Sequence, residues 1–413
     1  MRATAGVKQF GVGNIFTSLK YPNYRLWFFG QLISLVGTWT QTTAQGYLIY
    51  ELTRSPQFLG YASFANGLPS WLFTLYAGAI ADRVPRRTLM VITQSSMLVL
   101  AFVLAGLTFT HSIQWWHIII LTFLLGISNA FDAPARQAFV LEMVDREDMT
   151  NAIALNSTMF NSALVLGPAF GGLVYAWVGP GWCFTINGIS FIAVIIALLL
   201  MRLKPFVPVP SNGNTFGDVR DGMKYVFANP AVRRLITNLF IFTIFGFGFV
   251  TLLPAWAVEV LGGDATTNGF LQAARGFGSL IGALTIAAMG RFKFSGKLWT
   301  INSFVLPIMM VVFAYMHSLV PSLVAIACGG FSTMMVLNIT NAMVQNRIAD
   351  EMRGRVMGIY TFFFFGAFPL SSLIAGWAAQ RIGEALTVII SAIILMAFAV
   401  WVFWRQPGLR TME

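Results

Sequence analysis

The sequence is built from apolar runs of about twenty residues that alternate with short polar connections. An α-helix rises about 1.5 Å per residue, so a helix of this length crosses the roughly 30 Å hydrocarbon layer of a membrane. The chain therefore reads as an all-α membrane protein with twelve transmembrane helices. The runs lie at 25–51, 58–81, 88–110, 115–135, 151–178, 181–202, 233–259, 268–290, 298–316, 320–345, 355–380 and 384–404.

Composition excludes several other classes of protein. Of the 413 residues 57% are hydrophobic and 10% are charged, against about 25% charged in soluble domains. The net charge of +11 could suit nucleic acid, but the basic residues cluster between apolar runs, as membrane topology requires. Cys183 and Cys328 lie inside apolar runs, and the sequence lacks catalytic-triad, phosphate-loop and metal-ligand spacings. We expect a lipid partner, no nucleic acid, no cofactor, no metal and no enzyme activity.

Basic residues also predict how the chain lies in the membrane. If connections are assigned alternately to the two sides, one side receives 23 of the 26 Lys and Arg residues. The opposite side receives only Arg54 and Arg381, and Arg275 is left inside a run. Cytoplasmic connections are enriched in Lys and Arg. Both termini and the central connection are therefore expected in the cytoplasm.

The two halves of the chain are related. At an offset of 204 residues, Gly78 meets Gly282 and Gly172 meets Gly376, both near corresponding helix ends. Parallel repeats of six helices are typical of transporters. Between the halves lies a proline-rich polar segment. Within it, residues 218–227 are predicted to form either a short interfacial helix or a solvated linker helix that only joins the halves. The predicted units are a six-helix bundle at 1–203, a cytoplasmic linker with a short interfacial helix at 204–230, and a second bundle at 231–413.

The connection between the second and third runs carries a motif. It reads Gly78-Ala-Ile-Ala-Asp82-Arg83-Val-Pro85-Arg86-Arg87. Glycine allows close helix approach, and the arginines hold a cytoplasmic surface. The motif resembles the signature loop of the major facilitator superfamily, with Pro85 where that loop usually has Gly. The resemblance implies two pseudo-symmetric six-helix bundles that alternate access, in the major facilitator fold.

The fifth run contains Gly167-Pro168-Ala-Phe-Gly171-Gly172. Glycines permit tight packing, and proline frees a backbone carbonyl and bends the helix. This segment is similar to the antiporter signature found in the fifth helix of proton-coupled exporters of the superfamily. The alternative is a packing helix that has no part in coupling.

Five further segments of the chain support a narrower resemblance. They resemble the drug-antiporter branch that includes enterobactin exporters and macrolide efflux proteins, the transmembrane secretion effectors. The resemblance implies proton-driven export of siderophores, drugs or similar amphipathic molecules across a bacterial inner membrane. Import by symport and lipid flipping are the alternatives. One departure is Thr122, which stands where many drug antiporters have Arg four residues before Gly126. The five segments are 37–41, 50–56, 133–138, 151–156 and 179–184.

Polar residues inside the runs are candidates for a binding site, because they are costly in lipid unless they face a cavity or one another. In the first run they recur at spacings of three and four, which places them on one helix face. The superfamily resemblance puts the first and tenth helices beside the central path. The alternative role is hydrogen bonding between helices. The predicted substrate-binding residues are Gln31, Thr38, Gln41, Gln45, Asn338 and Asn341.

Charged residues near or inside the runs are the candidates for coupling and gating. Asp132 is expected near the cytoplasmic surface, paired with Arg86 or Arg83. Glu259 and Arg275 either pair with each other, or Glu259 carries the transported proton. The expected partners are a small organic substrate and protons, and the protein is expected to be a monomer. The predicted coupling or gating residues are Asp82, Arg83, Arg86, Arg87, Asp132, Arg136, Glu259 and Arg275.

Overall fold

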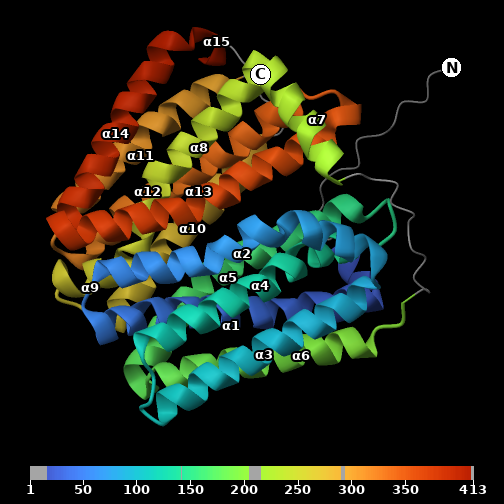
Figure 1. The fold of residues 1–413 in the computed structure, drawn as a ribbon, viewed down its shortest axis with the longest axis vertical. Helices are drawn as coiled ribbons and strands as arrows, with labels where there is room; N and C mark the ends of the chain where they lie inside the picture. Colours follow the sequence, from blue (N-terminus) through green and yellow to red (C-terminus); the bar gives the residue numbers. More distant parts are fainter. Residues whose placement is uncertain (1–15, 141, 204–214, 290–293, 411–413) are drawn as a thin grey trace.

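The computed structural model describes residues 16–140, 142–203, 215–289 and 294–410. Within these ranges the chain is helical and has no β-strand (Figure 1). Twelve helices have 21 residues or more. They are α1 (Pro22–Thr53), α2 (Pro56–Arg83), α3 (Arg86–Phe109), α4 (Trp115–Val140), α5 (Met149–Val178), α6 (Pro180–Leu200), α8 (Pro230–Thr251), α10 (Ala265–Met289), α11 (Ser295–Tyr315), α12 (Leu319–Gln345), α13 (Arg353–Ile382) and α14 (Glu384–Arg405). The short helices are η2 (Thr17–Lys20), α7 (Thr215–Ala228), α9 (Leu253–Glu259), η3 (Asp350–Met352) and α15 (Pro407–Arg410).

The predicted all-α class with twelve membrane-spanning helices is confirmed. Each of the twelve apolar runs overlaps one of the long helices. Ten of these helices are long and apolar enough to cross a bilayer by length and composition. The other two, α1 and α2, have 32 and 28 residues and so have the required length. The polar stripe of α1 lowers its hydropathy, because its glutamines interrupt the apolar surface.

Two predicted boundaries were wrong. The seventh run is not one helix, because α8 ends at Thr251 and α9 begins at Leu253. Pro254 lacks an amide hydrogen, and just before it the Leu252 amide donates to the Phe249 carbonyl three residues earlier (3.0 Å), where α8 ends. The fourth helix continues to Val140, five residues past its predicted end, because Phe139 and Val140 pack in the core of the first bundle.

The long helices form two bundles, α1–α6 and α8–α14, which draw together at the end that carries α9 (Figure 1). A buried apolar cluster joins them there. Ala44, Leu48 and Tyr175 of the first bundle pack in this cluster with Ala255 and Ala265 of the second. The exact limits of the bundles and of the linker stay predictions.

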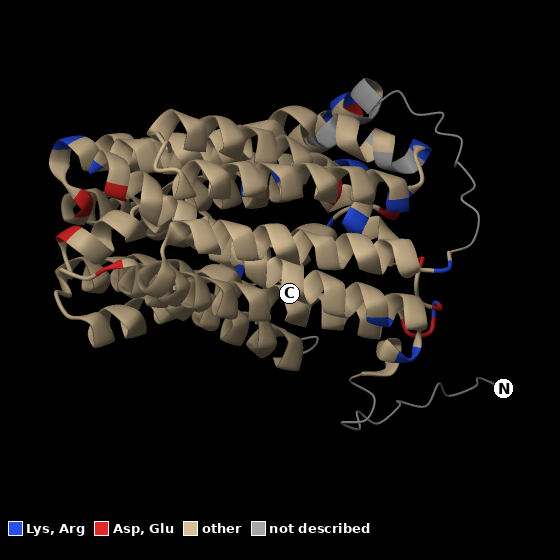
Figure 2. Ribbon diagram, turned by 90° about the horizontal axis from the view of Figure 1, so that it is seen from below, with Lys and Arg blue, Asp and Glu red and all other residues tan. Residues whose placement is uncertain are grey.

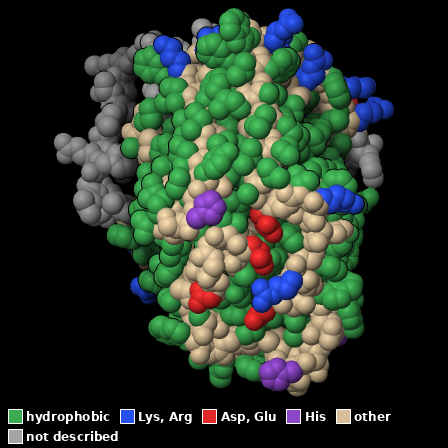
Figure 3. Space-filling view, turned by 90° about the vertical axis from the view of Figure 1, so that its left-hand side faces the viewer, with side chains coloured by type: hydrophobic (Ala, Val, Ile, Leu, Met, Phe, Trp, Pro, Cys, Tyr) green, Lys and Arg blue, Asp and Glu red, His purple; other side chains and the backbone are tan. Residues whose placement is uncertain are grey.

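The two ends of the molecule differ in charge (Figure 2). We call one the basic end, where α1 begins and where Arg83, Arg86 and Arg87 lie. We call the other the acidic end, where α9 ends. Figure 3 views the acidic end and shows acidic side chains gathered near its middle. The acidic-end residues are Glu51, Glu259, Asp264 and Glu384, with Arg54 and Arg381.

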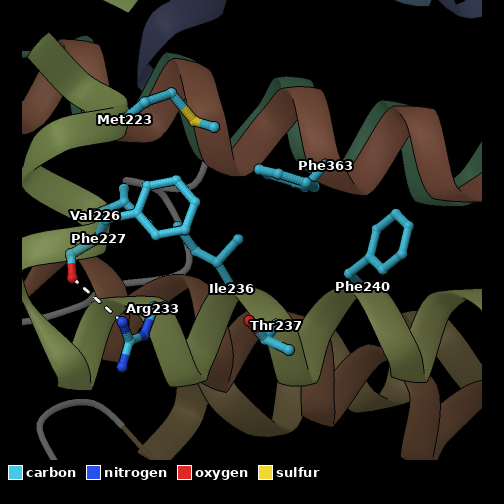
Figure 4. A pocket seen from close by; sticks show the side chains of 8 residues that line it. All are labelled: Met223, Val226, Phe227, Arg233, Ile236, Thr237, Phe240 and Phe363. Carbon is cyan, nitrogen blue, oxygen red and sulfur yellow. Dashed lines mark hydrogen bonds between the residues drawn. The ribbon is translucent and has the colours of Figure 1, made fainter. Parts of the chain in front are cut away.

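The linker helix α7 packs at the basic end, against α8 and α13. Met223 and Val226 of α7 face Ile236 and Phe363 across a cavity of about 100 Å³ (Figure 4). Arg233 lies at its rim and donates a hydrogen bond to the carbonyl of Phe227 (3.4 Å). This apolar cavity belongs to the second bundle and its linker, and it does not separate the two bundles.

Candidate functional site

Two helix crossings hold the bundles together in the half of the molecule nearer the acidic end. In the first, Gly60 of α2 faces Gly376 of α13; in the second, Gly172 of α5 faces Gly269 of α10. A Cβ added to Gly172 would lie 2.6 Å from the carbonyl oxygen of Ala265, and one added to Gly376 would lie 2.7 Å from a backbone oxygen of α2. Side chains larger than hydrogen therefore do not fit without separating the helices.

The antiporter-like segment of α5 lies at the junction of three helices. Gly167 and Gly171 pack against α1, and Thr40 donates a hydrogen bond to the carbonyl of Gly167 (3.1 Å). On another face, the Pro168 carbonyl approaches Gly269 of α10, beside Gly172. The segment thus contacts both bundles. Its role in coupling stays a prediction.

A polar contact also closes the acidic end. The Tyr50 hydroxyl of α1 donates a hydrogen bond to Oε1 of Glu259 (2.8 Å), and Ser55 bonds to Gln380 of α13. The expected alternative in which Glu259 pairs with Arg275 was wrong for this conformation. Glu259 ends α9, whereas Arg275 lies about 15 Å along α10, since each residue adds about 1.5 Å.

The polar stripe of α1 faces the interior of the first bundle. Gln31, Gln41 and Gln45 are all buried. Gln41 accepts a hydrogen bond from Asn187 of α6 (2.8 Å), and Gln45 donates one to Thr122 of α4. These contacts favour the alternative in which the glutamines join helices. Thr122 is thus an interhelical acceptor.

The remaining predicted binding residue of α1 is Thr38. Thr38 is half-buried, and its carbonyl accepts a hydrogen bond from Thr42 one turn later. Asn187 was not among the predicted residues, although an Asn in the middle of an apolar run is a signal of an interhelical partner.

Asn338 and Asn341 lie on α12 at a different depth from the glutamines. Both are half-buried, and Asn341 accepts a hydrogen bond from Gln345 (2.6 Å). From the acidic ends of their helices, Asn338 is about 29 Å away and Gln41 about 18 Å, at about 1.5 Å per residue. The structure therefore does not bring the two predicted groups to one level. Their role in substrate binding stays a prediction.

At the basic end the predicted pairing of Asp132 was wrong. Its carboxylate accepts hydrogen bonds from Thr93 and Gln94 of α3, both at 3.0 Å, and lies 3.6 Å from Nε of Arg136. Arg136 is one turn away on the same helix and so reaches Asp132 without any neighbouring helix moving. Arg86 pairs instead with Glu142, which follows α4.

The signature loop is only partly described. The side chain of Asp82 lies outside the described residues, and that of Arg83 is exposed. Arg87 donates to the carbonyl of Leu199, at the end of α6 (2.6 Å). A Cβ on Gly78 would meet no other atom within 4 Å. Close helix approach at Gly78, which the motif predicts, is therefore absent in this conformation.

Another basic-end contact joins the segment just before α1 to the residue just before α5. Lys20 Nζ lies 2.6 Å from a carboxylate oxygen of Asp148, just before α5. This hydrogen bond raises the pKa of Lys20 above its ordinary value. The Tyr21 hydroxyl donates to the same carboxylate (2.8 Å). Among the described residues no group of His, Cys, Asp and Glu side chains is arranged to hold a metal ion.

Comparison with known proteins shows which family and which relatives this chain resembles. A family model described as "Transmembrane secretion effector" matches residues 14–412. The chain is 24% identical to the staphyloferrin A transporter of Staphylococcus aureus, covering 89% of this chain and 92% of that one. It is 27% identical to the multidrug efflux pump Tap of Mycolicibacterium fortuitum (96% and 98% covered). It is 23% identical to the enterobactin exporter EntS of Shigella flexneri (86% and 84%).

Solved transporter structures share the fold at low sequence identity. The nucleoside transporter NupG superposes with a TM-score of 0.73 at 12% identity, covering 95% of this chain and all of that one. A bacterial homolog of the human lysosomal transporter Spinster, in an inward-facing and unoccupied conformation, gives 0.72 at 12% identity (95% and 97% covered). The fold is therefore that of these transporters. The family match over residues 14–412, with the two bundles and the motifs of α2 and α5, establishes that this integral membrane protein belongs to the transmembrane secretion effector family of the major facilitator superfamily.

Proposed function

We propose that this chain is a secondary active exporter that moves small organic molecules out of a bacterial cell in exchange for protons. The observation that carries the proposal is the family match over residues 14–412. Relatives named for a siderophore, macrolides and several drugs add support. Such a carrier works as a monomer in the inner membrane and needs no cofactor.

The basic end faces the cytoplasm in this proposal. Its support is the concentration of Lys and Arg at that end, because cytoplasmic connections of membrane proteins carry the excess of these residues. The acidic end then faces outward. The glycine crossings lie in its half, so the conformation is closed to the outside.

Glu259 is the residue proposed to carry the transported proton. It joins α9 to α1 through Tyr50 at the closed end. When the acidic end opens, this contact breaks and the carboxylate meets external water, from which it takes a proton. A carboxylate that changes partner with conformation is the requirement for coupling a proton to alternating access.

Transport into inverted membrane vesicles tests the proposal. The panel contains siderophores, macrolides and cationic dyes, and an acidic vesicle interior is imposed. We expect accumulation of at least one compound, and its loss when a protonophore collapses the gradient. Equal accumulation without a gradient would contradict proton antiport, and accumulation only in right-side-out vesicles would indicate an importer.

Glu259→Gln tests the coupling residue in the same vesicles. We expect gradient-driven accumulation to fall about a hundredfold or more, the lower end of a typical catalytic proton-transfer contribution, while substrate binding is retained. Asp264→Asn is the matched control, because Asp264 also lies at the acidic end but caps α10 by accepting from the Thr267 amide (3.1 Å). Asn caps helices equally well. Full proton-driven export by Glu259→Gln would assign coupling to another residue.

A further inference from the structure

Arg275 is a cation in the membrane interior of the second bundle. It lies ten residues after Ala265, the first residue of α10. At about 1.5 Å per residue this is about 15 Å along the helix, near the middle of a hydrocarbon layer of roughly 30 Å. Transporter substrates bind near this depth, at the interface between repeats.

The side chain lines a small hollow between three helices. Its neighbours there are Gly246 and Phe247 of α8, and Gly330 and Thr333 of α12. A Cβ on Gly330 would collide with the backbone of Arg275, so glycine is what allows α12 to pass at this level. The hollow has a volume of about 10 Å³, which is room for one small polar group and no more.

Arg275 has no counter-charge in the part of the chain that the structure describes. No ion pair includes it, and its Nε is buried without a hydrogen-bond partner. The residue as a whole remains partly exposed. The described carboxylates of the second bundle lie at helix ends: Glu259, Asp264 and Glu384 at one end, and Asp350 and Glu351 at the other.

An unpaired arginine at this depth is expensive, since charged side chains inside a membrane need a partner or water. Its fork of N–H donors matches a carboxylate with two parallel hydrogen bonds. Next to it, Phe247 packs edge to face with Phe364 and Phe368 of α13, at centroid distances of 6.2 and 5.7 Å. A cationic side chain therefore lies beside a cluster of aromatic side chains. This arrangement suits a molecule that has an acidic group and an apolar part.

We propose that Arg275 binds a carboxylate of the exported molecule, with the aromatic side chains of α8 and α13 packing against its apolar part. This inference rests on the proposed export function and assigns it a substrate class, amphipathic organic anions. The acidic group enters the hollow, and the rest of the molecule lies between the bundles. Arg275 then selects substrates that carry a carboxylate, and Glu259 at the acidic end remains free to couple protons.

A matched pair of dyes tests this assignment. Rhodamine B carries a free carboxylate, and rhodamine B ethyl ester has the same ring system without that negative charge. Their binding to purified protein in detergent is measured by fluorescence anisotropy. We expect the acid to bind more tightly than the ester, and Arg275→Gln to weaken binding of the acid at least about tenfold, as for loss of a charged hydrogen bond. Arg275→Lys should keep part of this preference.

The control is Arg381→Gln. Arg381 is exposed at the acidic end, where its guanidinium stacks on Trp377 at 3.7 Å, so neither dye should bind differently. The inference is overturned if the wild-type protein does not prefer the acid, or if Arg275→Gln weakens both dyes equally. Export of the ester but not the acid in inverted vesicles would overturn it while leaving the proposed function intact. Absence of export for the whole compound panel would instead contradict the proposed function.

Thermal unfolding separates binding from a structural role. Arg275→Met removes a buried unpaired charge and keeps an unbranched side chain, so the Tm without dye should stay equal or rise. The stabilisation that the wild-type protein gains from rhodamine B should disappear. A marked fall in Tm without dye would show that Arg275 has a structural partner, against the inference.

Discussion

Asp132 shows how a carboxylate is accommodated inside a membrane-spanning bundle. It is buried, yet its oxygens accept from Thr93 and Gln94 and lie within ion-pair distance of Arg136. A buried charge is tolerated when hydrogen bonds and an opposite charge replace the lost water. The site therefore ties α3 to α4 at the basic end and is a point of stability.

Removing this carboxylate should destabilise the protein. Asp132→Leu leaves Arg136 and Gln94 without their acceptor, and we expect a loss of about 3 kcal/mol, typical of a broken buried ion pair. Asp132→Asn keeps an acceptor oxygen and should cost about half as much. Thermal unfolding in one detergent, followed by circular dichroism, measures both.

Glu142→Gln is the control for these variants. It breaks the more exposed pair with Arg86 and should cost less than about 1 kcal/mol, as surface ion pairs do. A Tm change for Glu142→Gln as large as that for Asp132→Leu would mean that burial does not set the strength of these contacts.

Residue spacing predicted the helix face of the α1 glutamines, but it did not predict their hydrogen-bond partners. The spacing of Gln31, Gln41 and Gln45 correctly places them on one face of α1, but spacing cannot say which helix that face meets. The face meets α4 and α6 inside the bundle. Glu259 and Arg275 are likewise close in sequence, but the turn between α9 and α10 places them at different depths.

At the scale of elements, apolar runs were enough to predict the helices. A stretch of about twenty apolar residues has few alternatives to a helix in lipid, because every backbone polar group must be satisfied internally. The break at Pro254 needed a further consideration. Hydropathy measures side-chain polarity and does not register a missing backbone amide hydrogen. The division of the seventh run into α8 and α9 therefore did not follow from its apolar composition.

The crossing of α5 and α10 makes a prediction about Gly172. In Gly172→Ala the new Cβ would lie 2.6 Å from the Ala265 carbonyl oxygen, so the helices must separate by a few tenths of an ångström or more. We expect a cost of about 1–3 kcal/mol, as for overpacking, and slower export in inverted vesicles. Gly376→Ala, at the related crossing, should behave alike.

The control for this pair is Gly106→Ala in α3, where a Cβ would meet no atom within 4 Å. Alanine is the better helix former, so this variant should be neutral or slightly more stable. If Gly172→Ala and Gly106→Ala had the same Tm and the same export rate, close contact at the crossing would not be part of the transport cycle.

The whole molecule is asymmetric along its length. Contacts between the bundles run from Tyr50 and Glu259 at the acidic end to Trp71 and Phe362 of α2 and α13, whose rings lie 5.7 Å apart. Nearer the basic end, Gly78 of α2 has open space beside it. Alternating access requires a second state in which the bundles are in contact at the basic end and separated at the acidic end.

Bulky side chains at the two glycines should therefore bias the molecule in opposite directions. Leu at Gly172 obstructs closure of the acidic end and disfavours the present state. Leu at Gly78 fits the open space here but obstructs closure of the basic end, and so favours the present state. A bias of about 1–3 kcal/mol from such a clash changes the ratio of states by about 5- to 150-fold.

Distances between spin labels measure this bias. After replacement of Cys183 and Cys328, one label pair at Gln57 and Arg381 reports on the acidic end. A second pair, at Thr88 and Arg355, reports on the basic end. Relative to the parent, Gly172→Leu should lengthen the acidic-end distance and shorten the basic-end one, while Gly78→Leu should sharpen both distributions around the values of the present conformation. Gly106→Leu, in open space on α3 away from both crossings, should leave both unchanged. If Gly172→Leu and Gly78→Leu moved the two distances in the same direction, the two ends of the molecule would not close in turn. The bundles would then not rock against each other about the α2–α13 and α5–α10 crossings, and access would have to be controlled by local gating at one end.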